Sequence, residues 1–174
     1  IWEKDLGVVH KFLVSPTPRA ALVLGKALSA GVRGLAQGLI VVVIALLLRV
    51  HLNFNLLSLL GVAVAVILGS ALFSTFSLII ACIVKTRERF MGLGQVLTMP
   101  LFFASNAIYP ISIMPSWLQV VSHLNPLTYE VDILRQLMLA GGTGTYQIGF
   151  DLGVLAVTTI ILVLIGAVMY PRVV

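Results

Sequence analysis

Long uncharged runs dominate the pattern of hydrophobic and polar positions in this chain. No Asp, Glu, Lys or Arg occurs within residues 34–48, 56–84 or 152–170. The second and third of these runs exceed the ~18 apolar residues that indicate a membrane-spanning helix. The pattern therefore predicts an all-α polytopic membrane protein with four spanning helices, which are expected over 27–48, 57–84, 91–109 and 152–170.

The start of the chain has a different pattern, which is typical of an amphipathic helix. Apolar residues recur there at helical spacing, with most charged residues between them, at Trp2, Leu6, Val9 and Leu13. This helix must end before the prolines of residues 15–18, because each proline removes a backbone donor and disfavours helical geometry in its predecessor. At about 14 residues it is too short to span a bilayer. We expect residues 1–26 to form a cytoplasmic segment that lies along a surface or a partner, followed by a transmembrane domain over 27–174.

Residues 110–145 are less hydrophobic than the spans but do not have the composition of a loop. Ser116 can cap a short helix there. Pro126 interrupts that helix, and Thr128 can cap a second one. We therefore expect a short helical element between the third and fourth spans. Asp151 is the expected cap of the fourth span.

The second of these short helices carries a cluster of charged residues. Asp132 and Arg135 are three positions apart and can pair on one helix face, with Glu130 beside them. One interpretation is a solvated surface pair. The other is a gate or a substrate entry.

Composition agrees with a membrane protein and excludes other classes. Of the 174 residues, 60% are hydrophobic and 10% are charged, whereas soluble domains average about 25% charged residues. The net charge of +5 does not indicate nucleic-acid binding, because the basic residues lie at the ends of apolar runs rather than on one surface. We expect a protein of the cell (inner) membrane that contacts the lipid bilayer and no nucleic acid.

The basic residues also predict the orientation of the chain. If the amphipathic start is cytoplasmic, only Arg49 and Arg135 lie on the external side. The others fall at or near the cytoplasmic side, namely Lys4, Lys11, Arg19, Lys26, Arg33, Lys85, Arg87, Arg89 and Arg172. By the positive-inside rule, both ends of the chain are therefore expected in the cytoplasm, and residues 110–145 on the external side.

No sequence motif for catalysis, metal binding or nucleotide binding is present. The sequence lacks His-Glu-x-x-His, Gly-x-Ser-x-Gly and paired aspartates within the spans. Gly25-Lys26 does not form a phosphate-binding loop, because Ala20 and Ala27 stand where a glycine and a hydroxyl residue are needed. We expect no enzyme activity and no cofactor bound by this chain.

Polar residues within the predicted spans are costly in hydrocarbon and usually face protein or water. Arg33 has two interpretations, a side chain that extends to the cytoplasmic interface or a group that lines a substrate route. The amide residues are candidates for the same route or for bonds between helices, namely Gln37, Gln95 and Asn106. Gly34 and Gly38 form a small-xxx-small pair that permits close helix approach.

Several blocks of sequence resemble those of one transporter family. Residues 2–16 end in Leu-Val-Ser-Pro and resemble the coupling segment of ABC-2 type transporter permeases, in the daunorubicin-resistance and nodulation-export group. Residues 100–110, 114–118 and 124–135 resemble the fifth span and the external helices of that family. The order and spacing of the blocks agree across almost the whole chain.

The resemblance implies a permease subunit with six spans, of which this chain is a carboxy-terminal fragment. It implies a second permease subunit, as a homo- or heterodimer, and separate ATP-binding subunits that use ATP and Mg²⁺. Contact with the ATP-binding subunit is expected from Glu3, Asp5, Leu6, Gly7, Val9, Lys11, Phe12, Leu13 and Pro16. A translocation path or gate is expected at Arg33, Gln37, Gln95, Asn106, Glu130, Asp132 and Arg135.

The leading hypothesis for function is an ATP-driven exporter of lipophilic drugs or lipid-like molecules. One alternative keeps the family but exports a lipid-linked saccharide. A non-transporting membrane scaffold and an intramembrane enzyme are the others. A neighbouring gene for an ATPase would favour either exporter.

Overall fold

The computed structural model describes residues 19–84 and 86–169. Within these residues the chain is helical, apart from its connections and an isolated bridge between Leu52 and Leu139. The helices are α3 (Arg19–Leu47), α4 (Leu56–Ile83), α5 (Arg87–Phe103), the 3-10 turn η1 (Ile111–Ile113), α6 (Ser116–Leu124), α7 (Pro126–Met138) and α8 (Ile148–Met169). The prediction of an all-α polytopic membrane protein is confirmed.

The number of candidate spans differs from the prediction. Among the described residues, three helices are long and apolar enough to cross a membrane, over Val23–Leu47, Leu56–Ile83 and Ile148–Met169. The third expected span, 91–109, is instead α5, which has 17 residues and a length of about 25 Å against about 30 Å of hydrocarbon. It ends early because Pro100 lies in its last turn and Asn106 adopts a positive φ of 62°.

Two helix starts also differ from the prediction. Helix α3 begins at Arg19 rather than at position 27, because no further proline follows Pro18 in this stretch and the single Gly25 does not break the helix. Helix α8 begins at Ile148, so Asp151 lies inside its first turn and does not cap it.

The cap of α7 is not the expected Thr128. Asn125 caps this helix, and its side chain accepts a hydrogen bond from the Leu127 amide, while Pro126 occupies the first turn. Proline suits that position because its fixed φ is helical and its missing N–H has no partner to lose. The Thr128 hydroxyl instead donates to the Ser122 carbonyl at 2.7 Å.

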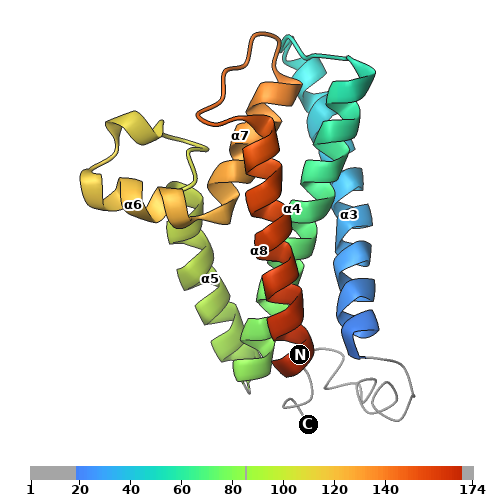
Figure 1. Ribbon diagram of the computed structural model, residues 1–174, viewed down its shortest axis with the longest axis vertical. Coiled ribbons are helices and arrows are strands. Elements are labelled where there is room, and N and C mark those ends of the chain that lie inside the picture. The colour runs from blue at the N-terminus through green and yellow to red at the C-terminus, as the bar shows by residue number, and fades with distance from the viewer. Residues whose placement is uncertain (1–18, 85, 170–174) are drawn as a thin grey trace.

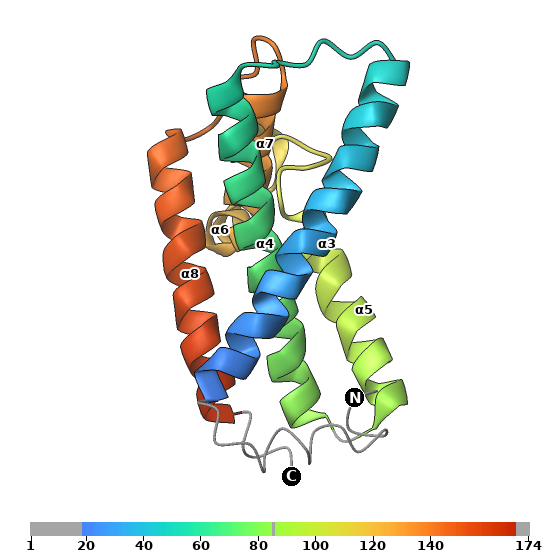
Figure 2. The same ribbon diagram turned by 90° about the vertical axis from the view of Figure 1, so that its right-hand side faces the viewer.

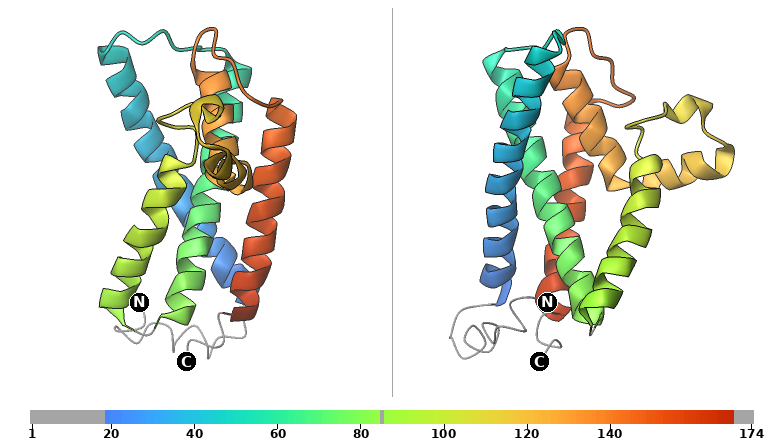
Figure 3. Two further views of the ribbon diagram at one scale, coloured as in Figure 1. Left: turned by 90° about the vertical axis from the view of Figure 1, so that its left-hand side faces the viewer. Right: turned by 180° about the vertical axis from the view of Figure 1, so that it is seen from behind.

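Helix α4 is the centre of the bundle. It packs against α3, α7 and α8, as the views in Figures 1 and 3 show. The buried core joins Ala65 and Leu72 of α4 to Tyr129 and Ile133 of α7 and to Leu155 of α8. Helix α5 has few contacts with α4 and leads into α6, which extends sideways from the bundle (Figure 1).

Helix α3 crosses α4 obliquely, as Figure 2 shows, and glycines permit the close approach. A Cβ atom on Gly34 would lie 2.1 Å from Ser70 Oγ, and one on Gly31 would lie 3.2 Å from a methyl group of Ile67. No atom lies within 4 Å of a Cβ built on Gly38. The expected pair is therefore half right, because Gly34 faces α4 whereas Gly38 does not.

The α3–α4 connection (48–55) and the α7–α8 loop (139–147) lie at the same end of the bundle, which we call the α7 end (Figure 1). The first residues of α3 and α5 and the last residues of α4 and α8 lie at the opposite end. After α5, the short helices α6 and α7 lead the chain back to the α7 end, where α8 starts.

Candidate functional site

The strongest cluster of polar side chains lies where α7 packs against α4 and α8, at the α7 end. Its acidic members come from α7 and from the first turn of α8. We call this set the α7 cluster, and it consists of His123, Tyr129, Glu130, Asp132, Arg135, Gln136, Tyr146, Phe150 and Asp151.

Asp132 fastens the α7–α8 loop to α7. Its side chain is fully buried. The carboxyl oxygens accept hydrogen bonds from the Thr145 amide at 2.7 and 3.0 Å and from the Tyr146 amide at 2.9 Å. The amide nitrogen of Gln136, one helical turn away, donates to the same carboxyl group at 3.3 Å. Both oxygens of the carboxyl group therefore have donors.

Asp151 is a second fully buried acid beside Asp132. Its Oδ2 atom lies 3.5 Å from the same Gln136 nitrogen. Its Oδ1 atom is buried and has no hydrogen-bond partner among the described residues. The Gln136 nitrogen also donates to the Tyr146 carbonyl at 3.0 Å, so its two hydrogens serve three acceptors.

Glu130 projects from α7 toward α4, into a space left by Gly69. A Cβ atom on Gly69 would lie 2.0 Å from Glu130 Oε1, so a larger residue there would collide with the carboxyl group. Burial raises the pKa of Glu130 from 4.5 to about 7. This acid therefore takes up a proton near neutral pH.

Arg135 joins α7 to the segment that follows α5. Its guanidinium donates to the Asn106 carbonyl at 2.7 Å, and Asn106 is buried with a left-handed backbone. The expected solvated pair of Arg135 with Asp132 is wrong, since Asp132 is buried and bonded to the α7–α8 loop. Both side chains form hydrogen bonds with residues distant in sequence instead of pairing with each other along the helix.

Two further residues fix the corner between α6 and α7 to the end of α5. The Asn125 side chain donates to the Leu101 carbonyl at 2.6 Å. The Thr128 hydroxyl, which donates to Ser122, also lies 3.4 Å from the Ala104 carbonyl. The end of α5 is therefore held by polar contacts with α7 and its cap.

Three aromatic rings cover the cluster, from Tyr129, Tyr146 and Phe150. Their centroids lie 5.4 to 6.0 Å apart. The Tyr129 hydroxyl donates to the His123 carbonyl at 2.6 Å, and the Tyr146 hydroxyl bonds to His123 Nδ1. Burial raises the pKa of both tyrosines, so both remain protonated hydroxyl groups.

The structure brings together only some of the residues predicted from the sequence. Asn106, Glu130, Asp132 and Arg135 lie in or beside the α7 cluster. Arg33 and Gln37 are exposed on α3 and Gln95 is exposed on α5, with no described contact to the cluster. The residues predicted to contact an ATP-binding subunit lie outside the described residues, and their roles stay predictions.

Sequence reasoning missed Gln136 and the burial of Asp151. A signal for Gln136 existed, because it follows Asp132 by four residues and so lies on the same helix face. A signal for Asp151 existed too, since it directly precedes an uncharged run of 19 residues, 152–170.

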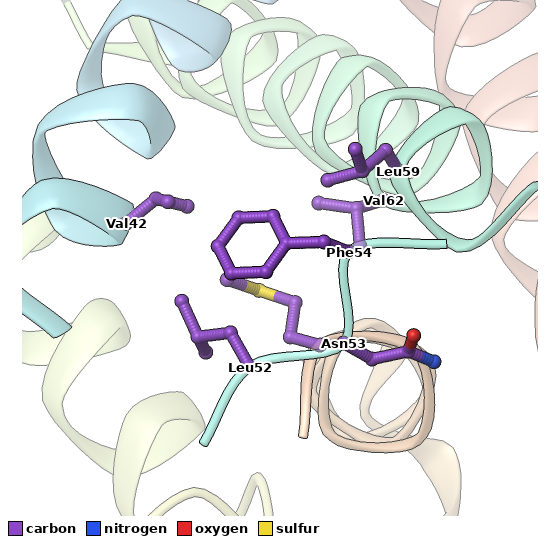
Figure 4. A pocket seen from close by; sticks show the side chains of 7 residues that line it. Val42, Leu52, Asn53, Phe54, Leu59 and Val62 are labelled. Atoms are coloured by element: carbon purple, nitrogen blue, oxygen red, sulfur yellow. The ribbon is translucent and has the colours of Figure 1, made fainter. Parts of the chain in front are cut away.

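A small apolar hollow lies between the α3–α4 connection and the end of α7 (Figure 4). Its volume is about 20 Å³, whereas ligand pockets of drug-sized molecules measure about 300–1,000 Å³. Its lining is Val42, Leu52, Asn53, Phe54, Leu59, Val62 and Met138. This hollow is too small for a substrate.

Comparison with known proteins gives one family and several relatives. The family described as ABC-2 type transporter matches residues 1–139. A putative transport permease, ycf38 of Cyanophora paradoxa, is 26% identical over 99% of this chain and 62% of its own length. The inner membrane transport permease YadH of Escherichia coli is 28% identical over 73% of this chain and 48% of its length. The probable multidrug ABC transporter permease YbhR of Escherichia coli is 30% identical over 79% of this chain and 37% of its length.

The chain therefore spans less than two thirds of the length of these relatives. No solved structure matches it.

Proposed function

Because the chain belongs to the ABC-2 type transporter family, we propose that it forms part of the permease subunit of an ATP-driven exporter of lipophilic or lipid-like substrates. ATP and Mg²⁺ are used by a separate ATP-binding subunit, and a second permease subunit completes the membrane part. Both ends of the chain face the cytoplasm in this proposal, with the α7 end outside.

The exposure of the long apolar helices is the observation that carries the proposal. Each of these helices contains an apolar stretch of 18 residues, of which only 6% is buried within the chain in α3 and 17% in α8. Such surfaces are covered by lipid or by other helices. We place the route between this chain, the rest of the permease and a second copy or relative.

The proposed link to the ATP-binding subunit rests on the start of the chain. Residues 1–16 fall within the part that matches the family. Helix α3 follows directly and begins at the end of the bundle opposite the α7 end. A helix docked on a soluble subunit, and joined to α3 through the prolines of 15–18, moves α3 when the subunit closes.

The proposed substrate class rests on chemistry and on one relative. YbhR is named a probable multidrug permease. Apolar helix faces suit lipophilic molecules that enter from the bilayer. A lipid-linked saccharide has a lipid portion of the same kind, so the test includes it as a second substrate.

The test is reconstitution of the full-length permease with its ATP-binding subunit in liposomes. We expect ATP hydrolysis that increases with a lipophilic dye, and ATP-dependent removal of the dye from the membrane. A variant of the ATP-binding subunit that cannot hydrolyse ATP is the control. Stimulation by a lipid-linked saccharide alone would replace the drug-like substrate, and no ATP-dependent movement of either would contradict the proposal.

A further inference from the structure

Two buried acids, Asp132 and Asp151, lie on either side of one amide group. Both side chains have 0% exposure. The Gln136 nitrogen lies 3.3 Å from Asp132 Oδ2 and 3.5 Å from Asp151 Oδ2. The Oδ2 atoms of the two acids therefore lie beside the same nitrogen. Two negative charges at this distance, away from water, repel strongly, so one site with two carboxyl groups favours a single ionisation.

The surrounding groups do not neutralise a second charge. Arg135 directs its guanidinium to the Asn106 carbonyl. His123 bonds to the Tyr146 hydroxyl, and Glu130 faces Gly69 of α4. The described residues contain no group of three His, Cys, Asp or Glu side chains arranged to hold a metal ion.

The hydrogen bonds distinguish the two acids. Asp132 accepts two backbone N–H groups and the Gln136 side-chain amide, so both of its oxygens have donors. Asp151 accepts one long bond, and its Oδ1 atom has no partner among the described residues. A buried carboxylate oxygen without a donor is costly, whereas a protonated carboxyl group supplies its own donor.

We propose that Asp132 and Asp151 together bind one proton, that Asp151 carries it, and that this proton fastens the α7–α8 loop to α7 and α8. The protonated Asp151 donates to the Asp132 carboxylate, which holds the Thr145 and Tyr146 amides. When the proton leaves to water, two buried carboxylates remain and repel, Asp132 releases the Thr145 and Tyr146 amides, and the loop separates from α7 and α8. The fastening responds to pH on the α7 side and does not depend on which substrate the permease moves.

The first test measures hydrogen exchange of the loop in the full-length permease. The Thr145 and Tyr146 amides report the opening, and Glu130→Gln is present in every sample so that this acid does not contribute. Each opening releases one proton, so opening rises about tenfold per pH unit above about pH 4, where an exposed aspartate titrates. At higher pH, where the closed site has also lost its proton, loop opening no longer depends on pH.

The matched variant is Asp151→Asn, which is neutral at every pH and has the shape of the protonated acid. We expect its loop opening, corrected for intrinsic exchange, to be independent of pH. Glu88→Gln, at an exposed acid on α5, keeps the parental pH profile. A pH-independent parental protein, or a variant Asp151→Asn with the parental profile, would overturn the proposal.

A second measurement avoids dependence on the stability of the variants. Infrared spectroscopy of the Glu130→Gln permease detects the C=O stretch of a protonated buried carboxyl group. We expect this band at neutral pH, its loss on alkalinisation, and its absence in Asp151→Asn. A band that persists in Asp151→Asn, with the same amplitude, would place the proton elsewhere. Neither measurement uses ATP or a substrate, so failure of the exporter proposal does not affect them.

Discussion

Replacement of Glu130 by Gln should stabilise the permease above neutral pH. Glu130 lies against Gly69 of α4, and burial raises its pKa from 4.5 to about 7. A group with a raised pKa contributes stability that is fully present below its unfolded-state pKa and is lost as pH rises through its folded-state pKa. For Glu130 this loss takes place between about pH 4.5 and about pH 7.

The difference between these two pKa values sets the size of the effect. Each pKa unit corresponds to 1.36 kcal/mol, so ionised Glu130 destabilises the protein by ~3 kcal/mol at pH 8, as an upper limit. Glu130→Gln has nearly the same shape and remains neutral. We expect it to be about as stable as the parent at pH 4, and ~3 kcal/mol more stable at pH 8, which corresponds to a rise in Tm of about 5 °C or more.

Thermal unfolding of the purified full-length permease in detergent measures this effect at both pH values. Glu88→Gln removes an exposed acid on α5 and is the matched control, since it should leave the pH dependence unchanged. If Glu130→Gln retains the whole difference between the two pH values, the carboxyl group is not buried against α4 and the reasoning is wrong.

Three further predictions concern other parts of the chain. Leu13→Asp should abolish dye export while ATP hydrolysis and membrane insertion remain, because it removes the proposed apolar contact with the ATP-binding subunit; unchanged export would refute the coupling role. Asn125→Ala should lower the free energy of unfolding by about 2 kcal/mol, since it removes a helix cap and a bond to α5; an unchanged Tm would contradict this. Gly34→Leu should destabilise the permease by ~2 kcal/mol or more because its Cβ meets Ser70 Oγ, whereas Gly38→Leu, in open space, should not; equal unfolding temperatures for the two variants would show that α3 does not approach α4 there.

Helix positions were largely predictable from the sequence because they depend on local pattern. The uncharged run over 56–84 gave α4 within one residue at each end. The end of α5 was not predictable, because apolar residues continue past Phe103 and the break depends on Pro100 and the backbone of Asn106. The hydrophobicity pattern alone therefore does not predict where α5 ends.

The contacts of the α7 cluster were less predictable. The sequence placed Glu130, Asp132 and Arg135 on one short helix, but their partners come from elements distant in sequence, such as Asn106 at 29 residues and Thr145 at 13 residues. Spacing along one helix indicates only pairs within that helix. It therefore favoured an Asp132–Arg135 pair, which tertiary contacts replace.

Helix α5 has a mechanical consequence for the permease. Most of its side chains are exposed, and it has few contacts with α4. Its last turn and the residues that follow are tied to the corner of α6 and α7 through Asn125 and to α7 through Arg135. A change in the tilt of α5 would thus break few packed contacts along its length while it pulls directly on α7. In this arrangement, movement of α5 is transmitted to α7 through these polar contacts.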